Sequence, residues 1–249
     1  MAKSRMKFLN IDIDNVTMEE ALSEIDVLIQ KGKNSYVVTP NVDHLITLEE
    51  DSCFREVYDN ADLILADGKP LIWISKLKKK PIKEKISGSD LFPKLAEYAS
   101  KRGYSMFLLG AAEGVAQKAA TNLKKKYEGL EVARCYSPKY GFEKDKDELR
   151  KIIDMVKEAK PHILVVGLGT PKQEKFIYRY REKLGVPVSL GLGASLDFEA
   201  GNVKRAPKWM REHGLEWFYR MCKEPGRLAK RYIKDGIKII PLMIKYRKW

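Results

Sequence analysis

Short runs of consecutive apolar residues, separated by stretches with helical periodicity, constrain the fold of this chain more than any other feature. A run such as Ile163-Leu-Val-Val166 is apolar on both sides, which is typical of a strand covered on both faces of a sheet. We expect strands at residues 36–39, 63–66, 105–109, 132–136, 163–166 and 186–190. Helical patterns lie between most of them, at residues 91–101, 114–127, 147–159 and 172–183. The repeated order predicts an α/β fold with a doubly wound, mostly parallel, Rossmann-like sheet.

The first thirty residues contain a further strand and a helix start. Residues 8–13 are predicted to form one short strand. Thr17 stands three residues before Glu20, the spacing of a capping box, and apolar residues at helical spacing follow. We therefore expect a helix to begin just after Thr17.

The pattern changes past Gly201, where no strand signal follows. The remaining residues are rich in basic and aromatic side chains, and Pro207, Pro225-Gly226 and Pro241 are predicted to separate two or three helices. Residues 204–249 hold fourteen basic and four acidic residues, so most of the net charge of +13 lies there. We expect residues 1–200 to form an α/β catalytic domain and residues 201–249 a basic helical appendage.

The end of the appendage has the composition of a membrane-surface helix. Isoleucines and lysines alternate from Ile233 onward, and aromatic residues follow up to Trp249, which suits a helix lying on anionic lipid.

No apolar run reaches the roughly 20 residues that cross a bilayer, and none has the length or position of a signal peptide. Cys53, Cys135 and Cys222 match no metal spacing and are expected to be reduced. We expect a cytoplasmic protein on the inner face of the membrane.

Polar or glycine-rich segments follow five of the predicted strands. In open α/β sheets, ligands bind beyond the carboxyl ends of the strands, so these segments are the candidate site. They are Thr39-Pro-Asn-Val-Asp-His44, Ala66-Asp-Gly68, Gly110-Ala-Ala-Glu-Gly114, Gly167-Leu-Gly-Thr-Pro-Lys-Gln-Glu174 and Gly191-Leu-Gly-Ala-Ser-Leu-Asp197. Asp67 ends an apolar run and precedes a glycine, where a carboxylate is placed to act as a general base.

Each of these residues also has a purely structural explanation. Asp67 fits a turn or capping aspartate, Asn41 and Asp43 fit helix caps, and Gly110 and Gly114 fit turn chemistry. The glycines do not give the dinucleotide fingerprint, and there is no P-loop, nucleophile elbow or His-Glu-x-x-His motif. The three histidines are scattered in sequence, so we expect no metal site.

Six segments together resemble the WecG/TagA/CpsF family of bacterial glycosyltransferases over residues 34–231. They are Thr39-Pro-Asn-Val-Asp-His44, Ala66-Asp-Gly68, Ser87-Gly-Ser-Asp90, Gly169-Thr-Pro-Lys-Gln-Glu174, Gly201-Asn-Val-Lys-Arg-Ala-Pro207 and Gly214-Leu-Glu-Trp-Phe-Tyr-Arg220. The last continues into Glu224-Pro225 and Arg227-Leu228. Any one segment is a weak signal, but six in the same order are specific.

The resemblance implies an inverting transfer of N-acetylmannosamine from UDP to undecaprenyl-diphospho-N-acetylglucosamine, forming a β-1,4 linkage. The product is the linkage disaccharide of wall teichoic acid or an early unit of another surface polysaccharide. Another UDP-hexosamine or uronate donor is the alternative within the family. By its motif Asp67 is similar to the catalytic base, and Thr39, Asn41 and Gln173 are similar to residues that line the sugar pocket. No cofactor is implied beyond the UDP-sugar substrate.

Without a metal, cationic side chains must stabilise the departing diphosphate. Arg220, Arg227 and Arg231 have spacings of seven and four residues and share one helical face if the helix continues through Pro225-Gly226. We hypothesise that the appendage folds over the donor and supplies these arginines. The alternative is a solvated basic face.

Two other function classes are weighed against this one. A nucleic-acid-binding module is suggested by the basic tail alone, but it leaves Asp67 without a role, so we expect no nucleic-acid partner. A nucleotide-dependent oxidoreductase on a Rossmann-like sheet lacks its fingerprint. Apolar residues of the appendage pack either on the body or on a second subunit, which leaves a homo-oligomer open.

Overall fold

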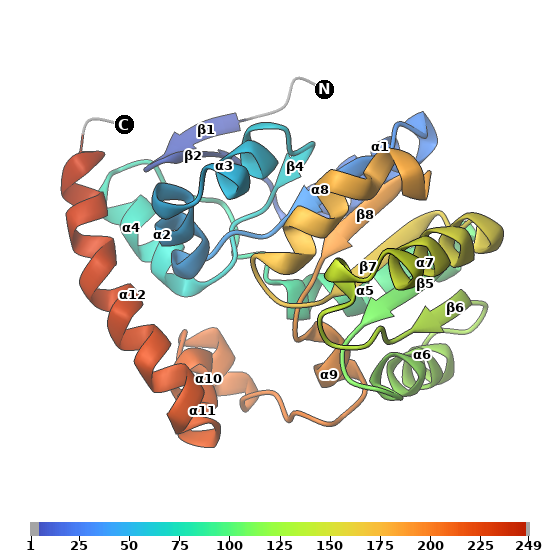
Figure 1. The fold of residues 1–249 in the computed structure, drawn as a ribbon. Coiled ribbons are helices and arrows are strands. Elements are labelled where there is room, and N and C mark those ends of the chain that lie inside the picture. The colour runs from blue at the N-terminus through green and yellow to red at the C-terminus, as the bar shows by residue number, and fades with distance from the viewer. Residues whose placement is uncertain (1–4, 248–249) are drawn as a thin grey trace.

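A six-stranded parallel sheet forms the centre of the molecule (Figure 1). The computed structural model describes residues 5–247, apart from the side chains of Glu212 and Arg227. The strand order is β4-β3-β8-β7-β5-β6, and every neighbouring pair is parallel. The strands are β3 (Ser35–Val38), β4 (Leu63–Ile64), β5 (Ser105–Gly110), β6 (Glu131–Tyr136), β7 (Ile163–Gly167) and β8 (Val188–Gly191). The predicted α/β fold with a Rossmann-like sheet is confirmed.

Helices cover both faces of the sheet, as the continuous apolar runs require. Within β5, Met106 and Leu108 belong to one apolar cluster, while Phe107 and Leu109 belong to the other. The first cluster includes α1 (Met18–Lys31), α5 (Gly88–Arg102), α6 (Val115–Lys126) and α9 (Ser195–Glu199). The second includes α2 (Val42–Glu50), α3 (Ser52–Asp59), α4 (Lys69–Leu77), the 3₁₀ turn at Phe142–Lys144, α7 (Lys146–Ala159) and α8 (Lys172–Leu184).

The prediction of a single strand at residues 8–13 is wrong. The chain forms an antiparallel hairpin of β1 (Arg5–Phe8) and β2 (Ile11–Asp14), because Leu9 takes a φ of 51° and reverses its direction. The buried Asp14 carboxylate accepts from Arg5 Nε at 3.0 Å within this hairpin, and it joins the hairpin to the main sheet by accepting from the Ile64 N–H at 2.8 Å. The capping box of Thr17 and Glu20 at the start of α1 is confirmed.

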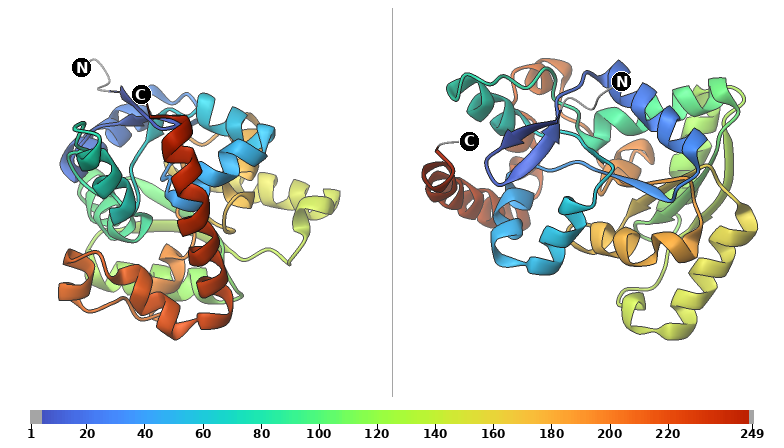
Figure 2. Two further views of the ribbon diagram at one scale, coloured as in Figure 1. Left: turned by 90° about the vertical axis from the view of Figure 1, so that its left-hand side faces the viewer. Right: turned by 90° about the horizontal axis from the view of Figure 1, so that it is seen from above.

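Residues 208–245 form α10 (Lys208–Glu212), α11 (Glu216–Lys223) and α12 (Pro225–Lys245). Pro207 and Pro225 each stand at a helix start, as predicted. The prediction that Pro241 separates two helices is wrong, because it lies inside α12. The helix continues past Pro241 because Leu242 is buried and Met243 packs against the core. Figures 1 and 2 show α12 running along the edge of the molecule beside α2, with its end near the β1–β2 hairpin.

The break between α11 and α12 corrects the prediction that three arginines share one helical face. Glu224 has a φ of −132° and a ψ of 62°, so the chain changes direction there. Arg220 therefore belongs to α11, while Arg227 and Arg231 belong to α12. Among residues 5–247, no helix combines the length and apolar character needed to span a bilayer.

Candidate active site

The segments that follow β3, β4, β7 and β8 surround a polar cavity of about 390 Å³ at the carboxyl ends of the strands. Six residues singled out from the sequence line this cavity: Thr39, Asn41, Asp67, Gln173, Arg220 and Arg231. The first four come from the α/β body, and the two arginines come from the appendage. The side chain of Arg227, the seventh, lies outside the described part of the structure.

Thr39 and Asn41 lie where β3 leads into α2. Thr39 is buried, and Asn41 is the N-cap of α2, with its side-chain oxygen accepting from the His44 N–H at 3.3 Å. The capping explanation for Asn41 is thus confirmed. Because the cap uses the amide oxygen, the side-chain NH₂ remains for a ligand in the cavity.

Gln173 is held in one orientation in the first turn of α8. Its side-chain oxygen accepts from the backbone N–H groups of Gly169 at 3.2 Å and Gly193 at 3.0 Å. Its Nε2 donates to Glu174 Oε1 at 2.7 Å. A Cβ on Gly191 would lie 3.1 Å from Gln173, so the glycine allows this close approach. With the oxygen fixed by two donors, one Nε2 hydrogen remains for the cavity.

Glu174 is a buried carboxyl group beside the cavity that sequence reasoning did not single out, although it lies in a recognised motif. It is 1% exposed, its Oε1 also accepts from Thr170 Oγ1 at 3.2 Å, and no described residue hydrogen-bonds its Oε2. Burial raises the pKa of Glu174 to about 7. The nearby His44 is buried between Tyr58 and Thr170, and burial lowers the pKa of His44 to about 3, which keeps it neutral.

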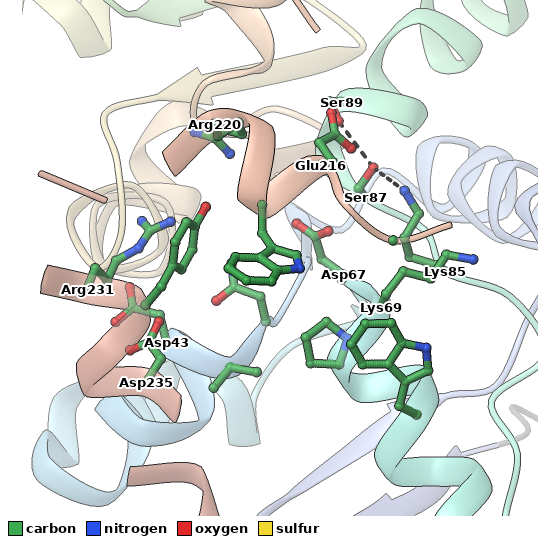
Figure 3. Close-up of a pocket in the computed structure, with 18 of the residues that line it drawn as sticks. Asp43, Asp67, Lys69, Lys85, Ser87, Ser89, Glu216, Arg220, Arg231 and Asp235 are labelled. Atoms are coloured by element: carbon green, nitrogen blue, oxygen red, sulfur yellow. Dashed lines mark hydrogen bonds between the residues drawn. The ribbon is translucent and has the colours of Figure 1, made fainter. Parts of the chain in front are cut away.

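Asp67 stands at the end of the segment that continues β4. Its N–H donates to the Pro40 carbonyl at 2.8 Å, which ties it to the β3 loop, and Gly68 follows with a φ of 96°. Burial raises the pKa of Asp67 to about 7, with Lys85 and Arg220 opposing the rise. A carboxyl group with a pKa near 7 suits a general base at neutral pH. Figure 3 shows Asp67 between Lys85 on one side and Arg220 and Arg231 on the other.

A network of ion pairs joins this region to the appendage. Asp90 accepts from Lys85 Nζ at 2.5 Å and Ser87 Oγ at 2.6 Å, and it pairs with Arg205 at 2.8 Å. Burial alone would raise the pKa of Asp90, but these partners outweigh burial and hold it at about 2. Arg205 also contacts Glu216 of α11 at 3.4 Å. Sequence reasoning missed these partners, although the Ser87-to-Asp90 and Gly201-to-Pro207 segments marked their positions.

Arg220 and Arg231 form no ion pair with another described residue. The Nε atom of each is buried, with no hydrogen-bond partner among the described residues. Arg220 lies over the Phe198 ring at 5.5 Å, and Arg231 lies over the Tyr232 ring at 5.0 Å. Two guanidinium groups beside glycine-rich loops, with no described carboxylate at ion-pair distance, are an arrangement suited to an anion.

A second cavity of about 380 Å³ adjoins the polar one and is mostly apolar. Asn41, Asp43, Asp67, Ser89, Phe198, Arg220 and Arg231 line both cavities. Asp67 therefore faces two compartments of different chemistry. Within residues 5–247, no group of three His, Cys, Asp or Glu side chains is arranged to hold a metal ion.

Comparisons with known proteins agree with the resemblance of the motifs. The glycosyl transferase WecG/TagA/CpsF family matches residues 6–249. A protein of Bacillus spizizenii is 35% identical over 80% of this chain and 75% of its own length. A protein of Staphylococcus aureus is 28% identical over 97% of this chain and 91% of its own. Both carry the name N-acetylglucosaminyldiphosphoundecaprenol N-acetyl-beta-D-mannosaminyltransferase. The chain is therefore an enzyme that belongs to the WecG/TagA/CpsF family of glycosyltransferases.

Proposed function

We propose that this enzyme transfers N-acetylmannosamine from UDP-N-acetylmannosamine to undecaprenyl-diphospho-N-acetylglucosamine, with inversion and without a metal ion. The product would be the β-1,4-linked disaccharide of wall teichoic acid or a related surface polysaccharide. The observation that carries the proposal is the position of Asp67, a carboxyl group with a raised pKa in the wall shared by a polar and an apolar cavity. The names of the relatives support this sugar and this acceptor.

In the proposed reaction, Asp67 takes the proton from the acceptor hydroxyl as its oxygen attacks the anomeric carbon. The bond from that carbon to the UDP oxygen breaks on the opposite face, so a single displacement inverts the configuration. Arg220 and Arg231 stabilise the charge that develops on the diphosphate. Thr39, Asn41 and Gln173 orient the sugar through their hydrogen-bonding groups.

A third cavity of about 480 Å³ offers room for the nucleoside of the donor. Ala111, Ser137, Tyr140 and Lys172 are among its lining residues, and it shares Gly167 with the polar cavity. Gly167 ends β7 and pairs with Gly110 of β5, between two strands whose following connections run in opposite directions across the sheet. This is the switch point at which doubly wound sheets bind nucleotides.

The outer face of α12 supports the proposed position on the inner membrane surface. Ile233, Ile237, Ile240 and Ile244 are 58–66% exposed and recur every three or four residues, so they form one stripe. The opposite face is buried at Leu228, Asp235 and Leu242. An apolar stripe beside lysines favours anionic lipid. The homo-oligomer that the sequence leaves open would form through the same apolar surface of α12.

A donor panel tests the proposal. UDP-N-acetylmannosamine, UDP-N-acetylglucosamine and a UDP-N-acetylmannosaminuronate would be offered with a lipid-diphospho-N-acetylglucosamine acceptor, with and without EDTA. We expect acceptor-dependent UDP release from the first donor alone, unchanged by EDTA, and a β anomeric configuration in the product by NMR. Preference for another donor would overturn the assigned sugar, and loss of turnover in EDTA would overturn metal independence.

A competition experiment distinguishes membrane binding from nucleic-acid binding by the basic appendage. We expect binding to vesicles that contain anionic lipid and no competition by duplex DNA at physiological salt. Salt-sensitive DNA binding without vesicle binding would favour the nucleic-acid module.

A further inference from the structure

The apolar cavity beside Asp67 has the shape and position of a second substrate site. Its walls come from the start of α2, from α4, and from all three appendage helices. Apolar side chains from four helices contribute: Val42, Pro70, Trp73, Trp217 and Ile239. Asp67 lies in the wall that this cavity shares with the polar, glycine-lined one. A molecule in the apolar cavity therefore meets the same carboxyl group as a molecule in the polar cavity.

Two cations that the polar cavity does not share, Lys69 and Arg211, line this mostly apolar cavity. The side chains of Lys69 and Arg211 have no hydrogen bond or ion pair with another described residue, and the Nε of Arg211 is buried. The other lysine of the cavity, Lys85, is paired with Asp90. Both residues are half-buried, and a cation that is partly shielded from water and has no partner among the described residues suits the binding of an anion.

The loop between α10 and α11 fixes Lys69 in this wall. Gly214 has a φ of 76°, and a Cβ there would lie 2.7 Å from Lys69 Cγ and 3.1 Å from the Trp73 ring. Any other residue would push the loop away from α4. The appendage thus packs directly on the side chains of Lys69 and Trp73.

An apolar path leads from the cavity to the surface along α4. Trp73 is 51% exposed and Leu77, four residues later on the same helix face, is 71% exposed. Exposed large apolar side chains that continue a cavity mark a site for an apolar partner. From Asp67 along α4, the order is carboxyl group, the Lys69 cation, then the apolar side chains of Trp73 and Leu77.

We propose that the apolar cavity binds the diphosphate and the first isoprene units of the lipid acceptor. Lys69 and Arg211 bind the diphosphate, and Trp73 and Leu77 contact the isoprene chain. This deepens the proposed function and rests on it for the identity of the acceptor. The order of groups matches the order in the lipid, in which a sugar is followed by a diphosphate and then by hydrocarbon. The sugar hydroxyl then reaches Asp67 from the side opposite the donor.

Farnesyl diphosphate is a probe that tests the site without any transfer reaction. Calorimetry would measure its binding to the wild-type chain, to Lys69→Gln and to Arg211→Gln. Each variant is expected to bind it about tenfold or more weakly, because each loses a charge-assisted contact. Lys76→Gln, on the same helix but outside the cavity, is the matched control and should bind it normally. UDP affinity should be unchanged in all three variants.

Steady-state kinetics separate this proposal from the proposed function. In the two cavity variants, we expect the KM for a polyprenyl-diphospho-sugar acceptor to rise about tenfold while the KM for the donor stays unchanged. Trp73→Ser should raise the acceptor KM more for a long isoprene chain than for a short one. Equal farnesyl diphosphate binding by the wild type and both cavity variants would overturn the site. Variant-dependent binding without any transfer by the wild type would overturn the proposed function and leave the site standing.

Discussion

The side-chain amide of Gln173 donates a hydrogen bond of 2.7 Å to the buried carboxyl group of its neighbour Glu174. Two backbone N–H groups already fix the Gln173 oxygen, so this bond decides where the remaining amide hydrogen points. In the proposed reaction, Glu174 is thus a positioning residue for Gln173, which lines the polar cavity. Because Gln173 and Glu174 are both buried, loss of the Glu174 oxygen would leave Gln173 Nε2 without a hydrogen-bond partner.

The first prediction concerns Glu174→Ala and Glu174→Gln. The alanine variant leaves Gln173 Nε2 without its buried partner, so we expect kcat/KM for the donor to fall about 10- to 100-fold. The glutamine variant keeps an acceptor oxygen of the same shape and should recover most of that loss. Donor kinetics together with melting temperatures check this. If both variants lost only stability and kept the donor KM, Glu174 would have a purely structural role.

The second prediction concerns pH. Because the pKa of Asp67 is raised to about 7, the base is protonated in acid, and kcat/KM should fall about tenfold per pH unit below 7. The raised pKa also means that ionising Asp67 lowers the free energy of unfolding. That stability is fully present below pH 3.8, the ordinary pKa of an aspartate, and is lost as the pH rises from 3.8 through about 7. The melting temperature of Asp67→Asn relative to the wild type should therefore rise over that range. A flat pH profile of activity would contradict this assignment.

The third prediction concerns Arg205, which pairs with both Asp90 and Glu216. Arg205→Ala should lower the free energy of unfolding by about 1–3 kcal/mol at pH 7, since it leaves two partly buried carboxylates without their shared partner. Because these partners hold the pKa of Asp90 at about 2, that stabilisation is present above its ordinary pKa of 3.8 and is lost as the pH falls toward 2. Urea unfolding at pH 7 and pH 3 measures the difference. A change below 0.3 kcal/mol, about the level of an ordinary surface substitution, would show that the ion pairs contribute nothing to holding the appendage.

The fourth prediction concerns the isoleucine stripe of α12. Ile237→Ser combined with Ile240→Ser should reduce sedimentation with anionic vesicles at least about tenfold and leave the melting temperature unchanged, because both side chains are exposed. Leu242→Ser is the matched comparison on the buried face and should lower the melting temperature. Unchanged vesicle binding by the double variant would exclude the stripe as the membrane contact.

The parallel sheet could be predicted from the sequence because buried strands such as Ile163-Leu-Val-Val166 have no polar alternation. The hairpin at residues 5–14 could not, because it depends on a positive φ at Leu9, a residue with no turn preference. Pro241 was expected to end a helix, but the packing of Leu242 against the core outweighs the lost hydrogen bond.

The residues of the candidate site were likewise predictable only in part. Asp67 was found because it follows a predicted strand, and the strand ends meet at one edge of a parallel sheet. Thr39, Asn41 and Gln173 lie in segments at the same edge, but it was the family resemblance that singled them out. Asp90, Arg205 and Glu216 were missed because their contacts join residues more than ten positions apart across two parts of the chain. Periodicity carries no information on such contacts. The same holds for Lys69 and Arg211, which line one cavity although they lie far apart in the sequence.

The most direct test of the account is UDP release from UDP-N-acetylmannosamine with a lipid-diphospho-N-acetylglucosamine acceptor, comparing the wild type with Asp67→Asn. Asp12→Asn, which changes an exposed carboxylate on β2, is the matched control. We expect acceptor-dependent release by the wild type and the control, and a fall of about 10²- to 10⁴-fold in kcat for Asp67→Asn with donor binding intact. Equal acceptor-dependent release by Asp67→Asn and the wild type would contradict the assignment of Asp67 as the base.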